Sequence, residues 1–137
     1  MFARPYAYRH IVATLFGCRA DLLDDKLLLD TAVKAIHDAN MQLAKTESPN
    51  PLVYKVGDDI MGGGVSVNAL ITTSHLTVHT SRLHRTVEFD CATCGRDSDP
   101  WAALDTFKRA LRATHVTTQY EHDELQQHVL AAPSIET

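Results

Sequence analysis

Residues 65–80 read VSVNALITTSHLTVHT, and this stretch predicts two neighbouring strands that meet near Ser74. Valine, threonine and isoleucine are frequent in it, and these β-branched side chains favour extended backbone. One face of the first strand is apolar and carries Val65, Val67, Ala69 and Ile71. The other face is mixed and carries Ser66, Asn68, Leu70 and Thr72. We expect this second face to line a site or a seam between two copies of the chain.

Two helices are expected, one on each side of this hairpin in the sequence. The first, over residues 24–44, has apolar side chains at helical spacing, namely Leu28, Ala32, Ile36, Ala39 and Leu43. The second begins at Asp99 and Pro100, which suit a helix cap and the first helical position, and runs to about residue 113. Four further strands are expected, at residues 8–18, 52–56, 86–93 and 115–120.

This order of elements predicts an α+β fold with an antiparallel sheet, because short turns join most successive strands. Two helices that cover one face of such a sheet give a two-layer sandwich. The chain has 137 residues, and we expect a single domain over residues 1–137. Gly57 to Gly64 should form a turn with unusual backbone freedom, and residues 131–137 should fray.

Composition argues against several classes of protein. The formal net charge is −4, and the sequence has no basic patch of the kind that a nucleic-acid-binding protein needs. No apolar run approaches the ~20 residues of a membrane span, and polar residues interrupt the N-terminal stretch where a signal peptide would lie. The three cysteines are interpreted as free thiols, which indicates a reducing cytoplasm.

The histidines and cysteines suggest two other chemistries. His75, His79, Cys91 and Cys94 are ligand types that bind Zn²⁺. Histidines four apart on a strand, however, lie roughly 13 Å apart along the chain, too far for one ion. A CxxC redox pair works best at a helix N-terminus, and this one ends an expected strand. We therefore expect no metal ion, and each residue taken alone fits an ordinary half-buried strand.

Three stretches together resemble the S-adenosylmethionine decarboxylase family in its short bacterial and archaeal form. They are RHIVATLFGC at 9–18, GVSVNALITTSHLTVHT at 64–80 and TCGRDSDPWAALDTFKRAL at 93–111. The resemblance implies a self-processing enzyme of polyamine synthesis that carries a pyruvoyl group made from serine. A decarboxylase needs such a carbonyl because no ordinary side chain is an adequate electron sink. The resemblance also implies a homodimer with its sheets face to face, in four layers αββα, whose sites draw residues from both chains.

The family's modified serine corresponds to Ser74. By resemblance, its hydroxyl attacks the carbonyl of Thr73, turns the amide into an ester, and eliminates to leave residues 1–73 and 74–137 as separate chains. Residue 74 then becomes the pyruvoyl group that forms a Schiff base with the substrate. Thr73 replaces the acidic residue usual before this serine, so processing is expected to be slow.

Three neighbouring residues take roles from the same resemblance. His79 corresponds to the base of the processing step, and Ser66 to the serine that hydrogen-bonds the rearranging carbonyl. Cys94 corresponds to the donor that returns a proton to the substrate carbon. The glycines at 62–64 let the backbone approach closely, and His75 is expected only to orient the scissile bond.

The positions that hold the nucleoside in relatives differ here. An aromatic, a proline and a glutamate after the second histidine are replaced by Ser81, Arg82 and Leu83. A second stacking aromatic corresponds to Ile60, and a first-strand glutamate to Thr14. Stacking and ribose hydrogen bonds are each worth roughly 1–3 kcal/mol, so these changes weaken nucleoside binding.

The substrate is therefore expected to be a smaller α-amino acid, arginine or ornithine. Its basic side chain needs a carboxylate, for which Asp58, Asp59 and Glu88 are candidates, although each also fits a solvated charge. S-adenosylmethionine itself is the alternative substrate. A different class also stays open, namely an uncleaved, non-catalytic partner of an active paralogue.

Overall fold

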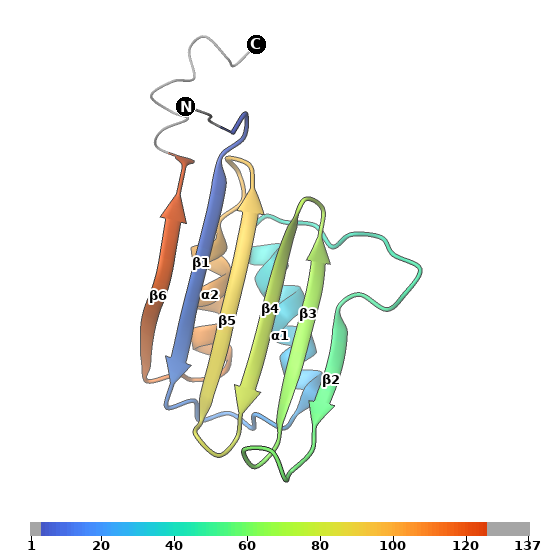
Figure 1. Ribbon diagram of the computed structural model, residues 1–137, viewed down its shortest axis with the longest axis vertical. Helices are drawn as coiled ribbons and strands as arrows, with labels where there is room; N and C mark the ends of the chain where they lie inside the picture. Colours follow the sequence, from blue (N-terminus) through green and yellow to red (C-terminus); the bar gives the residue numbers. More distant parts are fainter. Residues whose placement is uncertain (1–3, 126–137) are drawn as a thin grey trace.

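A computed structural model describes residues 4–125 and shows one six-stranded sheet with two helices. All strand pairs are antiparallel, and the strand order across the sheet is β2-β3-β4-β5-β1-β6. The strands are β1 (Tyr8–Phe16), β2 (Leu52–Val56), β3 (Gly64–Ile71), β4 (Ser74–Ser81), β5 (Thr86–Cys94) and β6 (His115–Asp123). Both helices lie on one face of the sheet and leave the other face open (Figure 1). The predicted two-layer α+β sandwich is therefore confirmed.

The two helices begin where capping residues predict. In α1 (Asp25–Asp38) the Asp24 carboxylate accepts a hydrogen bond from the N–H of Leu27. In α2 (Pro100–Ala110) the Asp99 carboxylate accepts from the N–H groups of Trp101 and Ala102. The second helix thus starts at the predicted cap.

The end of the first helix was predicted wrongly. The apolar spacing suggested a helix to residue 44, whereas α1 ends at Asp38. Asn40 takes a left-handed conformation with φ +58°, and the N–H of Met41 returns to the carbonyl of Ile36, which closes the helix. Leu43, expected in the helical stripe, instead forms an isolated β-bridge with Ile71.

The core lies between the helices and the sheet. Alternate residues of the central strands point to the helices and are almost fully buried, including Ile11, Leu15, Val65, Val67, Leu76, Val78, Phe89 and Cys91. Phe107 of α2 meets Phe89 of β5 edge to face at 5.7 Å between ring centroids. Burial of these side chains fixes which face of every strand is left open.

Strands β1 and β6 differ from their predicted bounds by a few residues. Strand β1 stops at Phe16, because Gly17 has φ +62° and turns the chain away, and β6 continues to Asp123. The fraying expected at 131–137 lies outside the described residues.

Glycine at position 64 is required by a close approach between strands. A Cβ atom there would lie 2.1 Å from the carbonyl oxygen of Thr80, so no side chain fits unless the backbone moves. Gly62 and Gly63 precede it with φ of +73° and +88°. The expected glycine turn thus brings the backbones of β3 and β4 together at this end of the sheet.

Candidate active site on the open face of the sheet

Ser74 stands at the first position of β4, directly after the two-residue turn Thr72–Thr73. Its hydroxyl oxygen accepts a hydrogen bond of 3.1 Å from the main-chain N–H of Cys94. The preceding residue, Thr73, is exposed and has φ +65°, a left-handed conformation that is costly for a β-branched residue. The peptide bond expected to break therefore follows a strained residue, and the attacking hydroxyl is held in place.

One residue beside Ser74, Thr93, was not foreseen from the sequence. The register of β4 with β5 pairs His75 with Ala92, and its continuation sets Thr93 opposite Ser74. The hydroxyl of Thr93 is buried and has no hydrogen-bond partner among the described residues. A buried hydroxyl without a partner carries a free-energy cost, so it is a polar group available beside the cleavage position.

Cys94 is the accessible thiol of the three cysteines in the described part of the chain. Cys18 and Cys91 are buried, and burial raises the pKa of the Cys18 thiol to about 11 and that of Cys91 higher still. Cys94 is half-buried at the end of β5, directly opposite Tyr8 of β1. Burial also raises the pKa of the Tyr8 phenol, so this neighbour is a neutral hydrogen-bond donor.

Ser66 and His79 form a hydrogen-bonded pair on the open face. They lie opposite each other on β3 and β4, with 2.7 Å between Ser66 Oγ and His79 Nδ1. Glu88 of β5 lies opposite His79 and accepts a hydrogen bond of 2.7 Å from Thr14 of β1. A serine, an imidazole, a carboxylate and a second hydroxyl thus run in one row across four strands.

The two groups of residues lie at opposite ends of the β3–β4 hairpin. His79 lies five positions after Ser74 along one strand, and this corresponds to about 16 Å at the usual rise per residue. Within one chain His79 is therefore too far from Ser74 for a proton transfer. The structure brings the Ser74 hydroxyl to the main chain of Cys94, and the Ser66 and His79 side chains together, but it does not bring the two pairs together.

The candidate substrate residues Asp58, Asp59 and Ile60 lie in the exposed turn that precedes β3. This turn is at the His79 end of the sheet, away from Ser74 of the same chain. The turn after β4 packs against it, since the N–H of Leu83 donates to the carbonyl of Met61.

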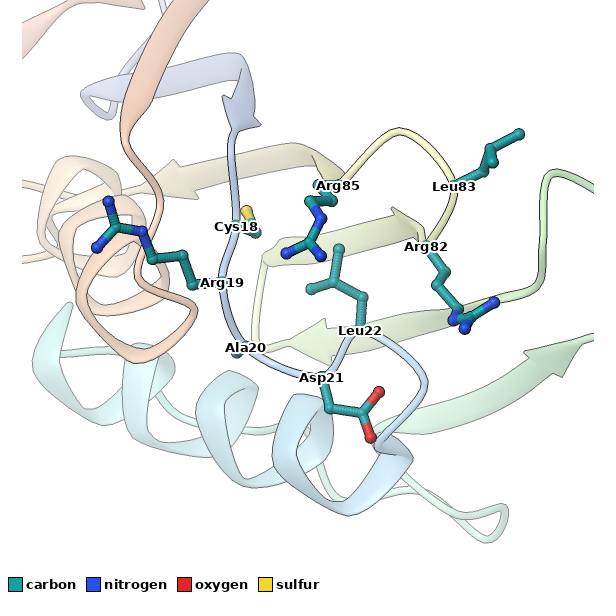
Figure 2. A pocket seen from close by; sticks show the side chains of 8 residues that line it. All are labelled: Cys18, Arg19, Ala20, Asp21, Leu22, Arg82, Leu83 and Arg85. Atoms are coloured by element: carbon teal, nitrogen blue, oxygen red, sulfur yellow. The ribbon is translucent and has the colours of Figure 1, made fainter.

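A cavity of about 470 Å³ lies at this same end, between the β4–β5 turn and the loop after β1. Figure 2 shows that Arg82 and Arg85 enter it from the turn, while Leu22 and Asp21 come from the loop. Arg19 also lines it, although its side chain extends away from the other two arginines (Figure 2). Because the guanidinium groups do not converge, the cavity does not form one anion-binding cradle.

A second cluster of titratable groups was missed from the sequence. His10 Nε2 and His75 Nε2 both contact Asp90 Oδ1, at 2.6 and 3.0 Å. The three residues come from β1, β4 and β5. His10 and His75 both pair with Ala92 of β5, from its two sides, so their side chains lie on the same face of the sheet as Ala92 and Asp90. The sequence did hold a signal for Asp90: Asp90, Ala92 and Cys94 alternate along the strand, so Asp90 shares a face with the predicted site residue Cys94.

The other chemistries considered from the sequence do not assemble. His75 and His79 lie on one extended strand, as expected. Cys91 faces the helices, whereas Cys94, three residues later, lies on the opposite side of β5. A zinc site built from those four residues, or a dithiol pair, would need a different backbone.

Comparison with known proteins agrees with this fold. Residues 9–123 match the protein family described as S-adenosylmethionine decarboxylase. An S-adenosylmethionine decarboxylase proenzyme of Thermotoga maritima is 34% identical over 108 residues, which cover 79% of this chain and 77% of that protein. An arginine decarboxylase proenzyme of Pyrobaculum arsenaticum is 33% identical over 117 residues, covering 85% and 84%. The solved adenosylmethionine decarboxylase of Aquifex aeolicus has the same fold, with a TM-score of 0.70 at 24% identity and coverage of 88% and 92%.

The sheet, its open face and these relatives define a decarboxylase that is made as a proenzyme. The matched region includes nearly every described strand and both helices, and the chain belongs to the S-adenosylmethionine decarboxylase family. Proenzyme decarboxylases of this family depend in general on a pyruvoyl group. Among the described residues, no helix is long and apolar enough to cross a membrane.

Proposed function

We propose that Ser74 of this decarboxylase is converted into its pyruvoyl group by self-cleavage after Thr73. The Ser74 hydroxyl attacks the Thr73 carbonyl carbon, and the peptide nitrogen leaves it, so that an ester replaces the amide. A base removes the Cα proton of residue 74, the Thr73 carboxylate departs, and dehydroalanine forms. Water then replaces the nitrogen, which leaves as ammonia. The observation that carries this proposal is Ser74 Oγ, held 3.1 Å from the Cys94 N–H directly after a left-handed threonine.

The base in this proposal is His79 of a second copy of the chain. The separation of about 16 Å along β4 prevents His79 from acting on Ser74 of its own chain. A homodimer with two open faces in contact places the Ser74 end of one sheet over the Ser66–His79 end of the other, if the strands run in opposite directions. Exposed apolar side chains on this face support such packing, namely Leu52, Tyr54, Leu70 and Tyr120.

The pyruvoyl carbonyl supplies an electron sink for the bond between the substrate Cα and its carboxylate. The main chain of Cys94 contacts residue 74, and in this proposal the Cys94 thiol returns a proton to the substrate Cα after CO₂ leaves. The half-buried position of Cys94, compared with the inert Cys18 and Cys91, supports this assignment. The product of an amino-acid substrate would then be the corresponding amine, a precursor in polyamine synthesis.

We favour arginine or ornithine as the substrate, with Glu88 as the carboxylate that binds its basic group. Glu88 is exposed on the open face beside His79, whereas Asp58 and Asp59 lie in an exposed turn. The nucleoside-holding positions expected of relatives are Ser81, Arg82 and Leu83 here, and none of them offers the aromatic ring that stacks on adenine in relatives. S-adenosylmethionine stays the second candidate, because sequence identity does not discriminate between the two substrates. Two Pyrobaculum arsenaticum relatives, named S-adenosylmethionine decarboxylase proenzyme and arginine decarboxylase proenzyme, are 34% and 33% identical to this chain.

Complementation between two inactive variants tests the proposed site. Ser74→Ala removes the attacking hydroxyl, and His79→Ala removes the base, so neither variant cleaves alone. When both are produced together with different tags, the His79→Ala chain should be cut, because its Ser74 meets His79 of the other subunit. The Ser74→Ala chain should stay whole. If cleavage of the His79→Ala chain is not restored in purified mixed dimers, the assignment of His79 to the partner's bond is wrong.

Substrate choice is tested by CO₂ release from labelled arginine, ornithine and S-adenosylmethionine, measured side by side. Activity on a basic amino acid with none on the nucleoside supports the Glu88 assignment. Activity only on S-adenosylmethionine contradicts it and leaves the self-cleavage proposal intact. A chain that stays whole and releases no CO₂ from any of the three supports the non-catalytic class.

A further inference from the structure

The cluster of His10, Asp90 and His75 has the composition and geometry of a metal site. It offers two imidazole nitrogens and one carboxylate oxygen, and these three atoms all lie within 4.8 Å of one another. Both imidazoles direct the same atom, Nε2, at one oxygen of Asp90. Two nitrogens that converge on one carboxylate oxygen outline the space that a small cation fills with little movement of the side chains.

We propose that these three residues bind one divalent transition-metal ion of the Zn²⁺, Co²⁺ or Ni²⁺ class. Imidazole nitrogens suit these ions, whereas Mg²⁺ and Ca²⁺ prefer ligands that are all oxygen. Three protein ligands leave at least one coordination position for water, unlike a closed structural site with four ligands. The set shares only His75 with the four residues that the sequence suggested for zinc.

Neighbouring rings hold the His10 imidazole in place. Its Nδ1 lies 3.3 Å from the Tyr8 hydroxyl, and a metal-bound histidine usually has a partner on its second nitrogen. The rings of Tyr120 and His75 meet it edge to face, at 5.3 and 5.9 Å between centroids. The His10 and Asp90 side chains are 19% and 41% exposed, so an ion can enter from the open face.

The ion would connect parts of the chain that cleavage separates. This consequence rests on the proposed function: His10 belongs to residues 1–73, whereas His75 and Asp90 belong to 74–137. A bound ion would therefore bridge the two products beside residue 74. Binding itself does not depend on cleavage, so the metal site and the self-cleavage proposal fail separately.

The test is a Co²⁺ and Zn²⁺ titration of the tag-free wild-type protein after treatment with a chelator and dialysis. Visible absorption of Co²⁺ reports nitrogen and oxygen ligands directly, and calorimetry gives the Zn²⁺ affinity and stoichiometry. We expect one ion per chain and no comparable binding of Mg²⁺. Zn²⁺ should also raise the thermal unfolding temperature, because it binds the folded state.

Three variants and one matched control locate the site. His10→Ala, His75→Gln and Asp90→Asn should each weaken Zn²⁺ binding at least about tenfold, since each removes one of three ligands. Asp90→Asn keeps the size of the side chain and therefore serves if His10→Ala fails to fold. The control is His122→Ala, which removes a histidine that lies opposite His10 on β6 but is not one of the three ligands. This variant should bind Zn²⁺ as the wild type does. No saturable binding, or binding unchanged in folded ligand variants, would overturn the proposal.

Discussion

Thr73→Gly isolates the contribution of backbone strain to self-cleavage. Thr73 is the only β-branched residue with a positive φ among the described residues, and its carbonyl is the group that Ser74 is proposed to attack. A left-handed conformation costs an L-residue with a Cβ roughly 1–2 kcal/mol, whereas glycine adopts it freely. Formation of the ester frees the turn, so this strain favours the forward reaction.

The expected effect follows from that free energy. If the transition state releases all of the strain, Thr73→Gly raises the barrier by about 1–2 kcal/mol and slows cleavage roughly 5- to 30-fold. The stability of the uncut chain should change by less than about 1 kcal/mol, because glycine also has more freedom when unfolded. Freshly translated chain is followed over time on a denaturing gel, and the rate is taken from the loss of the full-length band.

Two control variants separate strain from other effects. Thr73→Ala removes the hydroxyl, which donates to the Thr72 carbonyl, but keeps the Cβ, and should cleave near the wild-type rate. Arg85→Gly relieves a residue with φ +54° in the distant β4–β5 turn and should leave the cleavage rate unchanged. If Thr73→Gly cleaves as fast as the wild type, strain at this turn does not drive the reaction and the reasoning is refuted.

Three further results are expected. Iodoacetamide at mildly alkaline pH should modify Cys94 first and leave Cys18 and Cys91 unmodified in the folded protein, because burial raises the pKa of both inner thiols. Peptide mass mapping shows which cysteine is modified first, and the opposite order would mean that the burial argument is wrong. Glu88→Gln should raise KM for arginine or ornithine about 10- to 100-fold with a smaller change in kcat, as expected for loss of one charged hydrogen bond. An unchanged KM would show that Glu88 does not bind the substrate. Phe107→Ala should lower the free energy of unfolding, measured in a urea titration, by about 3–5 kcal/mol, because the ring is fully buried. A loss below about 1 kcal/mol would contradict its central place in the core.

The hairpin and the second helix were predictable because local signals agree with their final environment. Alternation from Val65 to Ile71 matches the face that the helices cover, and Asp99 caps α2 as its sequence context suggests. The end of α1 was not predictable from apolar spacing. Leu43 continues the helical period, but a left-handed Asn40 stops the helix before it, and a β-bridge uses Leu43 instead.

The candidate site was only partly predictable for a topological reason. Ser66 and His79 meet because a short hairpin pairs them, so their proximity follows from local sequence. The contact of His10 with Asp90 depends on β1 pairing with β5, and the sequence order does not reveal that β1 lies between β5 and β6. Periodicity therefore found the strands but not their neighbours.

Intact mass spectrometry of the purified wild-type protein tests the central proposal most directly. We expect two chains, residues 1–73 and a second chain lighter by one ammonia than residues 74–137 with N-terminal serine. Borohydride should shift the mass of the second chain by reducing its ketone, and Ser74→Ala should stay whole. A fully active protein that remains one chain with an unmodified Ser74 would show that no pyruvoyl group forms at this position.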